Sequence, residues 1–170
     1  QSSGTIDVGE AGVGIYSDSG TLNLSSGLLN LNGLNTVGIY AIDNVVIDNN
    51  MLMNVSDESF GVVLNSGSSL INRNVSTVGD HGVFAYSDGG AFITNELGAD
   101  ITMTGSKSVG VYMTNGGTIT NKASITANAG DSNIGIYNNG GSIDNSGDIK
   151  IGDSVIVDPL NPFANSYAVG

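Results

Sequence analysis

A glycine-centred motif recurs along this 170-residue chain at intervals of 21 to 28 residues. The motif reads VGIYSDSG, VGIYAIDN, FGVVLNSG, HGVFAYSDGG, VGVYMTNGG and IGIYNNGG, and its anchor glycines are Gly14, Gly38, Gly61, Gly82, Gly110 and Gly135. Repeats of this length build proteins in which each unit buries its apolar face against the units on either side. The repeat therefore predicts one continuous stacked structure.

Each repeat contains three short segments that fit β-strands. The first is the glycine motif, the second has the form apolar-x-Asn, as in 119–121, and the third has the form apolar-x-apolar, as in 125–127. Clusters of Gly, Asn, Asp and Ser separate the segments and are strong turn signals. The sequence thus predicts an all-β fold, a parallel β-helix (β-solenoid) with about 24 residues and three short strands per coil and roughly six coils. Equivalent residues of successive coils would stack about 4.8 Å apart.

Alternation along the glycine-motif strand predicts which columns of residues face the core. The columns directly before and after the anchor glycine are mostly apolar, so both are expected to point inward. The column before the glycine comprises Val13, Val37, Phe60, His81, Val109 and Ile134. The residue two positions after the glycine is then expected to point outward.

That outward column contains a candidate aromatic ladder, interrupted at Val63. The ladder comprises Tyr16, Tyr40, Phe84, Tyr112 and Tyr137. One interpretation is structural, because stacked rings stabilise successive coils and shield their backbone. The other is a sugar- or protein-binding stripe, because exposed tyrosines are common contact residues.

The asparagine of each apolar-x-Asn segment lies two residues after an inward position, so it is also expected to face the core. The set comprises Asn49, Asn72, Asn95, Asn121 and Asn145. Amide side chains stacked in this way can bond to each other and to the turn backbone. The pattern predicts an internal asparagine ladder with a structural role.

Acidic residues gather just before the glycine motif and form a candidate acidic binding edge. They comprise Glu10, Asp57, Glu58, Asp80 and Asp131. Stacking of the coils should bring these residues onto one side of the rod. Such an edge either stays hydrated as a solubilising surface or attracts cations and basic partners rich in Arg or Lys.

The charge and composition exclude several classes of function. The formal net charge of −12 argues against nucleic acid, which requires a basic surface, and against direct binding to anionic lipid. The chain has no cysteine, which excludes a cysteine nucleophile or a thiolate-bound zinc. No catalytic residues, metal site or cofactor are indicated, and the prediction is that the chain is not an enzyme.

The repeated Gly-Ile/Val-Tyr strand, the Asn-Gly-Gly turn that follows it and the ITN…SIT segment resemble the passenger domains of large autotransporters. The likeness covers residues 4 to 153 and is nearest to the fusobacterial outer-membrane adhesins of the RadD-like group. It implies a type V secreted passenger on the bacterial cell surface, anchored in the outer membrane through a C-terminal β-barrel outside this chain. It also implies adhesion, with coaggregation or host attachment through surface proteins or glycans of other cells.

The sequence analysis therefore predicts a cell-surface adhesin segment, with two alternatives left open. One alternative is a purely structural stalk or spacer, and the other is a polysaccharide-cleaving β-helix enzyme. The repeat is incomplete at both ends, so residues 1–170 are interpreted as a single fragment of a longer β-helical passenger domain. The Pro-containing segment at 158–166 departs from the repeat and is expected to form a protruding loop.

Overall fold

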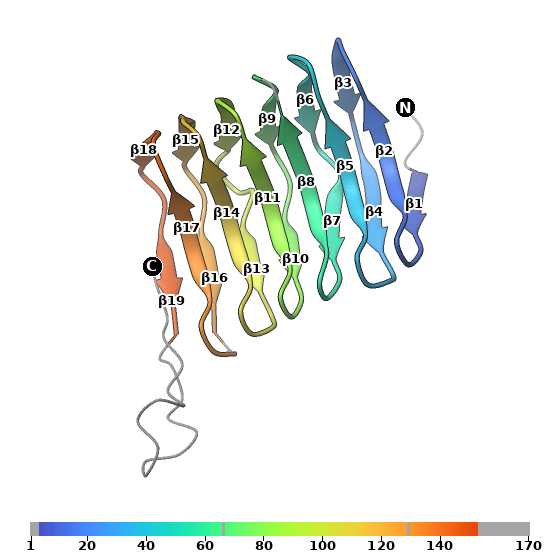
Figure 1. Cartoon of the computed structure of the whole chain (residues 1–170). Coiled ribbons are helices and arrows are strands. Elements are labelled where there is room, and N and C mark those ends of the chain that lie inside the picture. The colour runs from blue at the N-terminus through green and yellow to red at the C-terminus, as the bar shows by residue number, and fades with distance from the viewer. Residues whose placement is uncertain (1–3, 66, 129, 153–170) are drawn as a thin grey trace.

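The computed structural model describes residues 4–65, 67–128 and 130–152, and these form a β-solenoid rod (Figure 1). The chain winds through about six coils of about 24 residues, each with three strands, which confirms the predicted fold. Every strand pairs in parallel with its counterpart in the neighbouring coil. Among the described residues, no helix could cross a membrane. The predicted loop at 158–166 lies outside the described residues.

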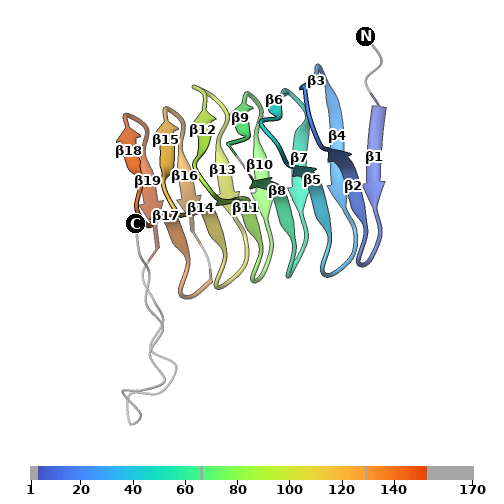
Figure 2. The same cartoon turned by 45° about the horizontal axis from the view of Figure 1, so that its top comes forward.

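The strands stack into three parallel sheets that run along the rod (Figure 2). Sheet A comprises β1 (Gly4–Val8), β4 (Gly27–Leu31), β7 (Leu52–Val55), β10 (Ser76–Val78), β13 (Ile101–Met103), β16 (Ile125–Ala127) and β19 (Ile149–Ile151). Sheet B comprises β2 (Val13–Ser17), β5 (Val37–Ala41), β8 (Phe60–Asn65), β11 (Val83–Asp88), β14 (Val109–Thr114) and β17 (Ile134–Asn138). Sheet C comprises β3 (Thr21–Leu24), β6 (Val46–Asn49), β9 (Ser69–Asn72), β12 (Ala91–Asn95), β15 (Gly117–Asn121) and β18 (Ser142–Asn145).

The core is a set of apolar columns that run the length of the rod. In sheet A the pair register places Leu29, Met53, Ile101 and Ile125 in one inward column, and each of these side chains is fully buried. In sheet C the equivalent column comprises Ile47, Leu70, Ile93 and Ile119, which are also buried. Stacking like residues in this way removes apolar surface from water in every coil, and this burial is the main stabilising contribution.

The prediction for the glycine-motif strand was wrong in one respect. The anchor glycine points inward, because a Cβ on Gly38 would lie 3.0 Å from Leu29 Cδ2 and 2.5 Å from the Gly61 carbonyl oxygen. The residue after it, Ile39, is fully buried, so two successive residues face the core. Strict alternation therefore fails at the glycine, and the residue before it points outward. Val13, in that outward column, is 51% exposed.

The fourth coil corrects a second part of the prediction. Val83 pairs with Phe60 and Val109, the residues before Gly61 and Gly110, so Phe84 and not Gly82 occupies the anchor column. Phe84 is fully buried and belongs to the core, so it is not a member of the outward aromatic ladder. His81 is also misassigned, because it is exposed in the preceding turn with a φ of 55°.

The fourth coil accommodates Phe84 because its neighbours are small. The Cβ position of Gly61 lies 2.7 Å from Met53 Sδ, which leaves no room there for a side chain. In the fourth coil the register places Ser76 where the third coil has Met53, and Ala85 where it has Val62. Ser87 likewise stands where the third coil has Leu64, so the phenylalanine ring takes the volume that three smaller residues release. The hydroxyl groups of Ser76 and Ser87 are buried there without a hydrogen-bond partner among the described residues.

Candidate functional site

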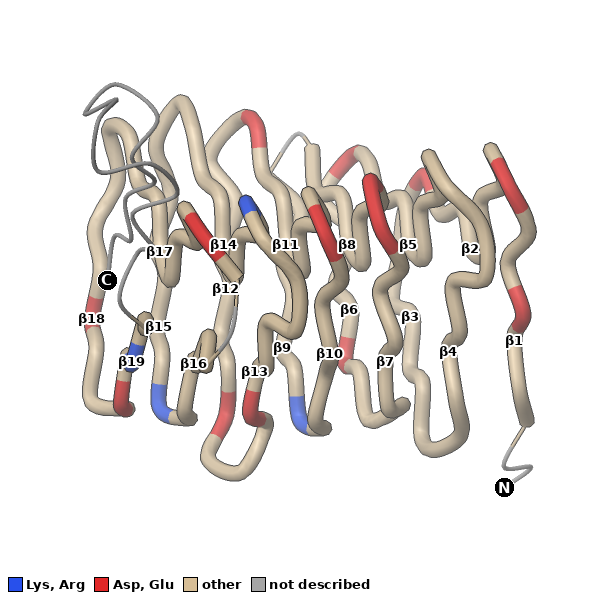
Figure 3. The backbone as a smooth tube through the Cα atoms, turned by 90° about the horizontal axis from the view of Figure 1, so that it is seen from below, with Lys and Arg blue, Asp and Glu red and all other residues tan. Residues whose placement is uncertain are grey.

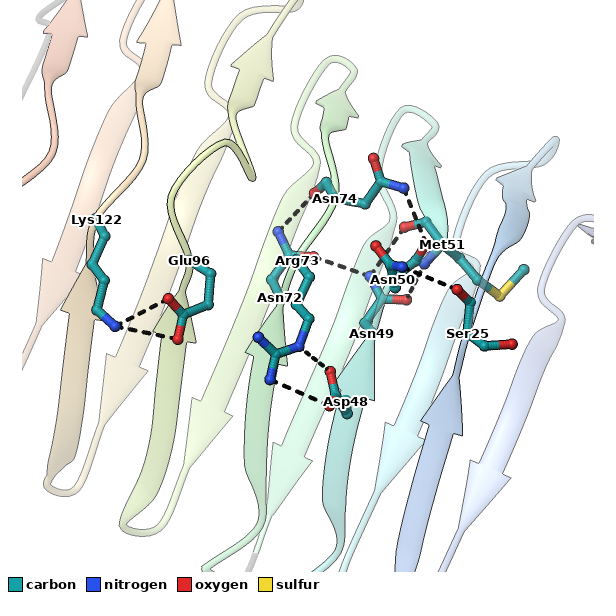
Figure 4. Close-up of polar contacts among 10 residues, drawn as sticks. All are labelled: Ser25, Asp48, Asn49, Asn50, Met51, Asn72, Arg73, Asn74, Glu96 and Lys122. Carbon is teal, nitrogen blue, oxygen red and sulfur yellow. Dashed lines mark hydrogen bonds and ion pairs between the residues drawn. The ribbon is translucent and has the colours of Figure 1, made fainter. Parts of the chain in front are cut away.

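Four members of the predicted asparagine ladder, Asn49, Asn72, Asn95 and Asn121, are buried inside the rod, and Asn145 is exposed at its end. Figure 4 shows Asn49 and Asn72. Asn49 Nδ2 donates to Asn72 Oδ1 at 3.0 Å, and the same bond links each asparagine to the next as far as Asn145. Asn49 and Asn121 also donate to the turn carbonyl two residues later. The amide groups form hydrogen bonds with one another and with backbone carbonyl groups, so the ladder stabilises the turn between sheets C and A.

Ion pairs join successive coils beside this ladder, on the outer side of the same turn. Arg73 Nε lies 2.6 Å from Asp48 Oδ1, and Lys122 Nζ lies 3.0 Å from Glu96 Oε2 (Figure 4). Both pairs are partly exposed, and exposed pairs of this kind contribute about 0–1 kcal/mol each. They help to fix the register of neighbouring coils, and two of the four basic residues of the chain are committed to them.

The tyrosine ladder covers the outer face of sheet B. Tyr16 and Tyr40 stack with ring centroids 5.8 Å apart and an interplanar angle of 7°. Tyr86 stacks on Tyr112 at 5.6 Å, and Tyr112 stacks on Tyr137 at 4.5 Å. Tyr86 therefore takes the place in the ladder that the sequence analysis had assigned to Phe84. The near-parallel planes show that the ring faces of neighbouring tyrosines turn toward one another, and the Tyr40 hydroxyl accepts a hydrogen bond from Asn65 Nδ2 at 3.0 Å.

Another aromatic residue lies beside the break in the ladder at Val63. Phe60 stands in the neighbouring column of the same strand, and its ring meets that of Tyr86 edge-on at 5.8 Å and 77°. Val63 itself is buried under its neighbours. The third coil thus exchanges the positions of its large and small outward residues relative to Val37 and Tyr40. The ring contacts of the described residues therefore form two runs, Tyr16–Tyr40 and Phe60–Tyr86–Tyr112–Tyr137.

An outward aliphatic column lies directly beside the tyrosines. It comprises Val13, Val37, Phe60, Val83, Val109 and Ile134. We call this column and the tyrosine column together the sheet-B strip, and it contains no charged residue. A shallow depression of about 320 Å³ in the strip is lined by Phe60, Val83, Tyr86, Val109, Tyr112 and Thr114. Contiguous apolar surface is a feature that many interaction sites share.

The central tyrosine of the strip has a perturbed hydroxyl group. Burial, and then the neighbouring phenols of Tyr137 and Tyr86, raise the pKa of Tyr112 above the ordinary tyrosine value. The phenol therefore keeps its proton throughout the physiological range and can both donate and accept a hydrogen bond. The strip offers a partner apolar contact together with a row of hydroxyl groups.

The acidic residues predicted to share an edge do so, in the turns that lead from sheet A into sheet B (Figure 3). The carboxylates of Asp57 and Asp80 each accept a hydrogen bond from a backbone N–H group of the next coil. The N–H of Asp80 donates to Asp57 Oδ1 at 2.8 Å, and the N–H of Ser106 donates to Asp80 Oδ1 at 2.6 Å. The edge also contains Lys107, which occupies the turn position that Glu58 and His81 occupy in earlier coils. The acidic edge thus has a structural task and a net negative charge.

The sequence analysis missed the aliphatic half of the strip, because it assigned that column to the core. A usable signal was present, since a glycine repeated in one column marks a close approach of backbone and core side chains. This signal would have predicted that the anchor glycine faces inward and that the residue before it faces outward.

Neither a metal site among the described residues nor a likeness to a known family indicates a role for the sheet-B strip. Within the described ranges, no group of three or more His, Cys, Asp or Glu residues is arranged to hold a metal ion. Comparison with protein-family models, with curated proteins and with solved structures finds no match for the chain. The sheet-B strip is the candidate functional site on physical grounds alone.

Proposed function

We propose that this chain is a segment of a bacterial cell-surface adhesin, and that the sheet-B strip is its contact surface in coaggregation or host attachment. The observation that carries the proposal is the strip itself. Partly exposed apolar side chains run along one sheet, from Val13 and Tyr16, which are 51% and 61% exposed, to Tyr137, which is 37% exposed, with Val109 buried among them. The exposed part of these side chains forgoes about 25 cal/mol per Å² of burial, which a partner that covers the strip would recover.

Tyrosine suits such a contact surface. Its ring supplies a large, rigid contact area with little loss of conformational entropy, and its hydroxyl group supplies a hydrogen bond. Stacking already holds the rings in place, with Tyr112 between Tyr86 and Tyr137. A preorganised surface of this kind loses less free energy in ordering when a partner binds. The resemblance to autotransporter passengers supports this proposal and implies a location outside the cell.

A stalk that spaces another binding domain from the membrane is the second candidate. It is favoured by the regular links between coils, which include the asparagine ladder and the ion pair between Arg73 and Asp48. Such links make a stiff rod. A spacer does not need an aromatic strip on one face only, and this difference separates the two candidates.

The test is inhibition of cell attachment by the purified chain. Bacteria that carry the full-length protein are mixed with partner bacteria or host cells after the partners have been incubated with the chain at micromolar concentration. The adhesin proposal predicts that the chain inhibits attachment and that the double variant Tyr86→Ser/Tyr112→Ser does not. The matched control is Phe92→Ser, which removes an aromatic side chain that is 57% exposed on sheet C. If the chain fails to inhibit, or if both variants inhibit like the unmodified chain, the strip is not the contact surface.

A further inference from the structure

Acidic residues border the sheet-B strip on both sides. On the side where the chain enters sheet B lie the acidic edge and its one lysine, Lys107. On the side where the chain leaves sheet B lie Asp18, Asp43 and Asp88, and none of the four basic residues of the chain lies there. The strip is therefore an uncharged apolar band between two negative borders.

These borders decide which partners fit. A second copy of the chain would place like charges opposite one another, and like-charge juxtaposition across an interface costs several kcal/mol. An anionic membrane surface is disfavoured for the same reason. A protein surface with an apolar centre and Lys or Arg at its margins complements both the strip and its borders.

The orientation of the tyrosine rings argues against a sugar as the ligand. Aromatic rings are negative on their faces and positive at their edges, so the weakly positive C–H groups of a sugar are attracted to ring faces. In the ladder the faces of Tyr86, Tyr112 and Tyr137 cover one another at 4.5 to 5.6 Å. What remains for a ligand is ring edges, hydroxyl groups and the aliphatic column, which suits apolar protein side chains.

From these observations we infer that the sheet-B strip binds a protein surface whose apolar centre is flanked by Lys or Arg side chains. This inference rests on the proposed function and names the chemical class of its partner. The apolar centre meets Val83, Val109 and the tyrosine edges, while the basic margins meet the acidic edge and the carboxylates of Asp18 and Asp88. Complementary charges of this kind speed association and fix the orientation of the partner.

The chain carries its own optical probe for a binding test. It contains no tryptophan, and five of its six tyrosines lie in the strip, so tyrosine emission reports on this face once Tyr167 is changed to Phe. The ligand probes are synthetic peptides without aromatic residues: alternating Leu–Lys, alternating Leu–Glu and alternating Ser–Lys. A cello-oligosaccharide serves as the sugar probe.

The inference predicts that only the Leu–Lys peptide changes the emission saturably, with at least about tenfold higher affinity than the other probes, and that added salt weakens its binding. Val83→Lys, which puts a positive charge into the strip, should weaken binding about tenfold or more, and Val13→Lys tests the same column at a more exposed position. Val46→Lys adds the same charge on sheet C, where Val46 is 41% exposed, and should leave binding unchanged.

Two outcomes would overturn the inference. Equal affinity for the Ser–Lys and Leu–Lys peptides would show that charge alone drives binding, and binding of the cello-oligosaccharide that is lost in Val83→Lys would identify a sugar site. The cell-attachment test remains independent of these outcomes. If Tyr86→Ser/Tyr112→Ser abolishes inhibition of attachment while the Leu–Lys peptide does not bind, the proposed function stands and the assignment of partner chemistry fails.

Discussion

Replacing Phe84 by glycine would give the fourth coil the residue that Gly61 and Gly110 provide in its neighbours, yet the structure predicts a large loss of stability. Phe84 is fully buried, and the residues around it are already small. Truncating a buried phenylalanine costs about 3–5 kcal/mol because the cavity does not collapse. Glycine in a strand adds about 0.5–1 kcal/mol of backbone entropy. The expected total is about 4–6 kcal/mol.

The same reasoning predicts how to restore stability. In the triple variant Ser76→Ile/Phe84→Gly/Ala85→Val, the fourth coil receives the residues that the next coil carries at these positions, Ile101, Gly110 and Val111. The three substitutions fill one shared volume, so their effects on the free energy of unfolding should be strongly non-additive. We expect the triple variant to recover most of the stability that Phe84→Gly loses.

Urea unfolding followed by circular dichroism measures these free energies through the midpoint and the slope of the transition. The matched control is Phe92→Gly, which makes the same chemical change on the exposed face of sheet C and should cost less than about 2 kcal/mol. The account of the core would be refuted if Phe84→Gly were no worse than Phe92→Gly. It would also be refuted if the triple variant were no more stable than the single one.

Three further predictions concern the ladders and the buried hydroxyl groups. Asn95→Ala leaves an N–H donor of Asn72 and the carbonyl acceptor of Asn121 without that partner. The free energy of unfolding should therefore fall by about 2–6 kcal/mol. Asn145→Ala, at the exposed end of the ladder, should lower it by about 1 kcal/mol. Ser76→Ala removes a buried hydroxyl group that has no partner, so its midpoint in urea should stay the same or rise. The pKa of Tyr112 is raised in the folded chain, so its contribution to stability is complete below the ordinary tyrosine pKa of about 10 and is lost as the pH rises through the folded pKa. An ultraviolet titration of the folded chain should therefore show one phenol that ionises late, and Tyr112→Phe should remove it.

The sequence predicts the architecture well because the solenoid depends on a repeat that is visible in one dimension. The asparagine column and the apolar columns of sheets A and C follow from alternation, which holds in those strands. Alternation fails in sheet B, where the anchor glycine and the residue after it both face inward. That failure arises from a close approach of backbone to core side chains, a three-dimensional constraint that strand periodicity does not encode.

The candidate site was predicted in part for the same reason. The tyrosine column was found, because one residue type recurs at one position of the repeat. The exchange of Phe84 for Tyr86 was missed, because the motif HGVFAYSDGG offers Gly82 as an anchor while the register uses Phe84. Only the packing of Phe84 against the small residues of its own coil makes that register favourable.

Chemical modification of the tyrosines in the bound state tests most directly whether the sheet-B strip is the contact surface. The chain is bound to partner cells, treated with a tyrosine-nitrating reagent and compared by mass spectrometry with the free chain. The account predicts that Tyr86 and Tyr112 are protected from nitration on binding, while acylation shows that Lys122 and Lys150, outside sheet B, react as in the free chain. Unchanged nitration of both tyrosines at saturating binding, together with protection of these lysines, would contradict the account.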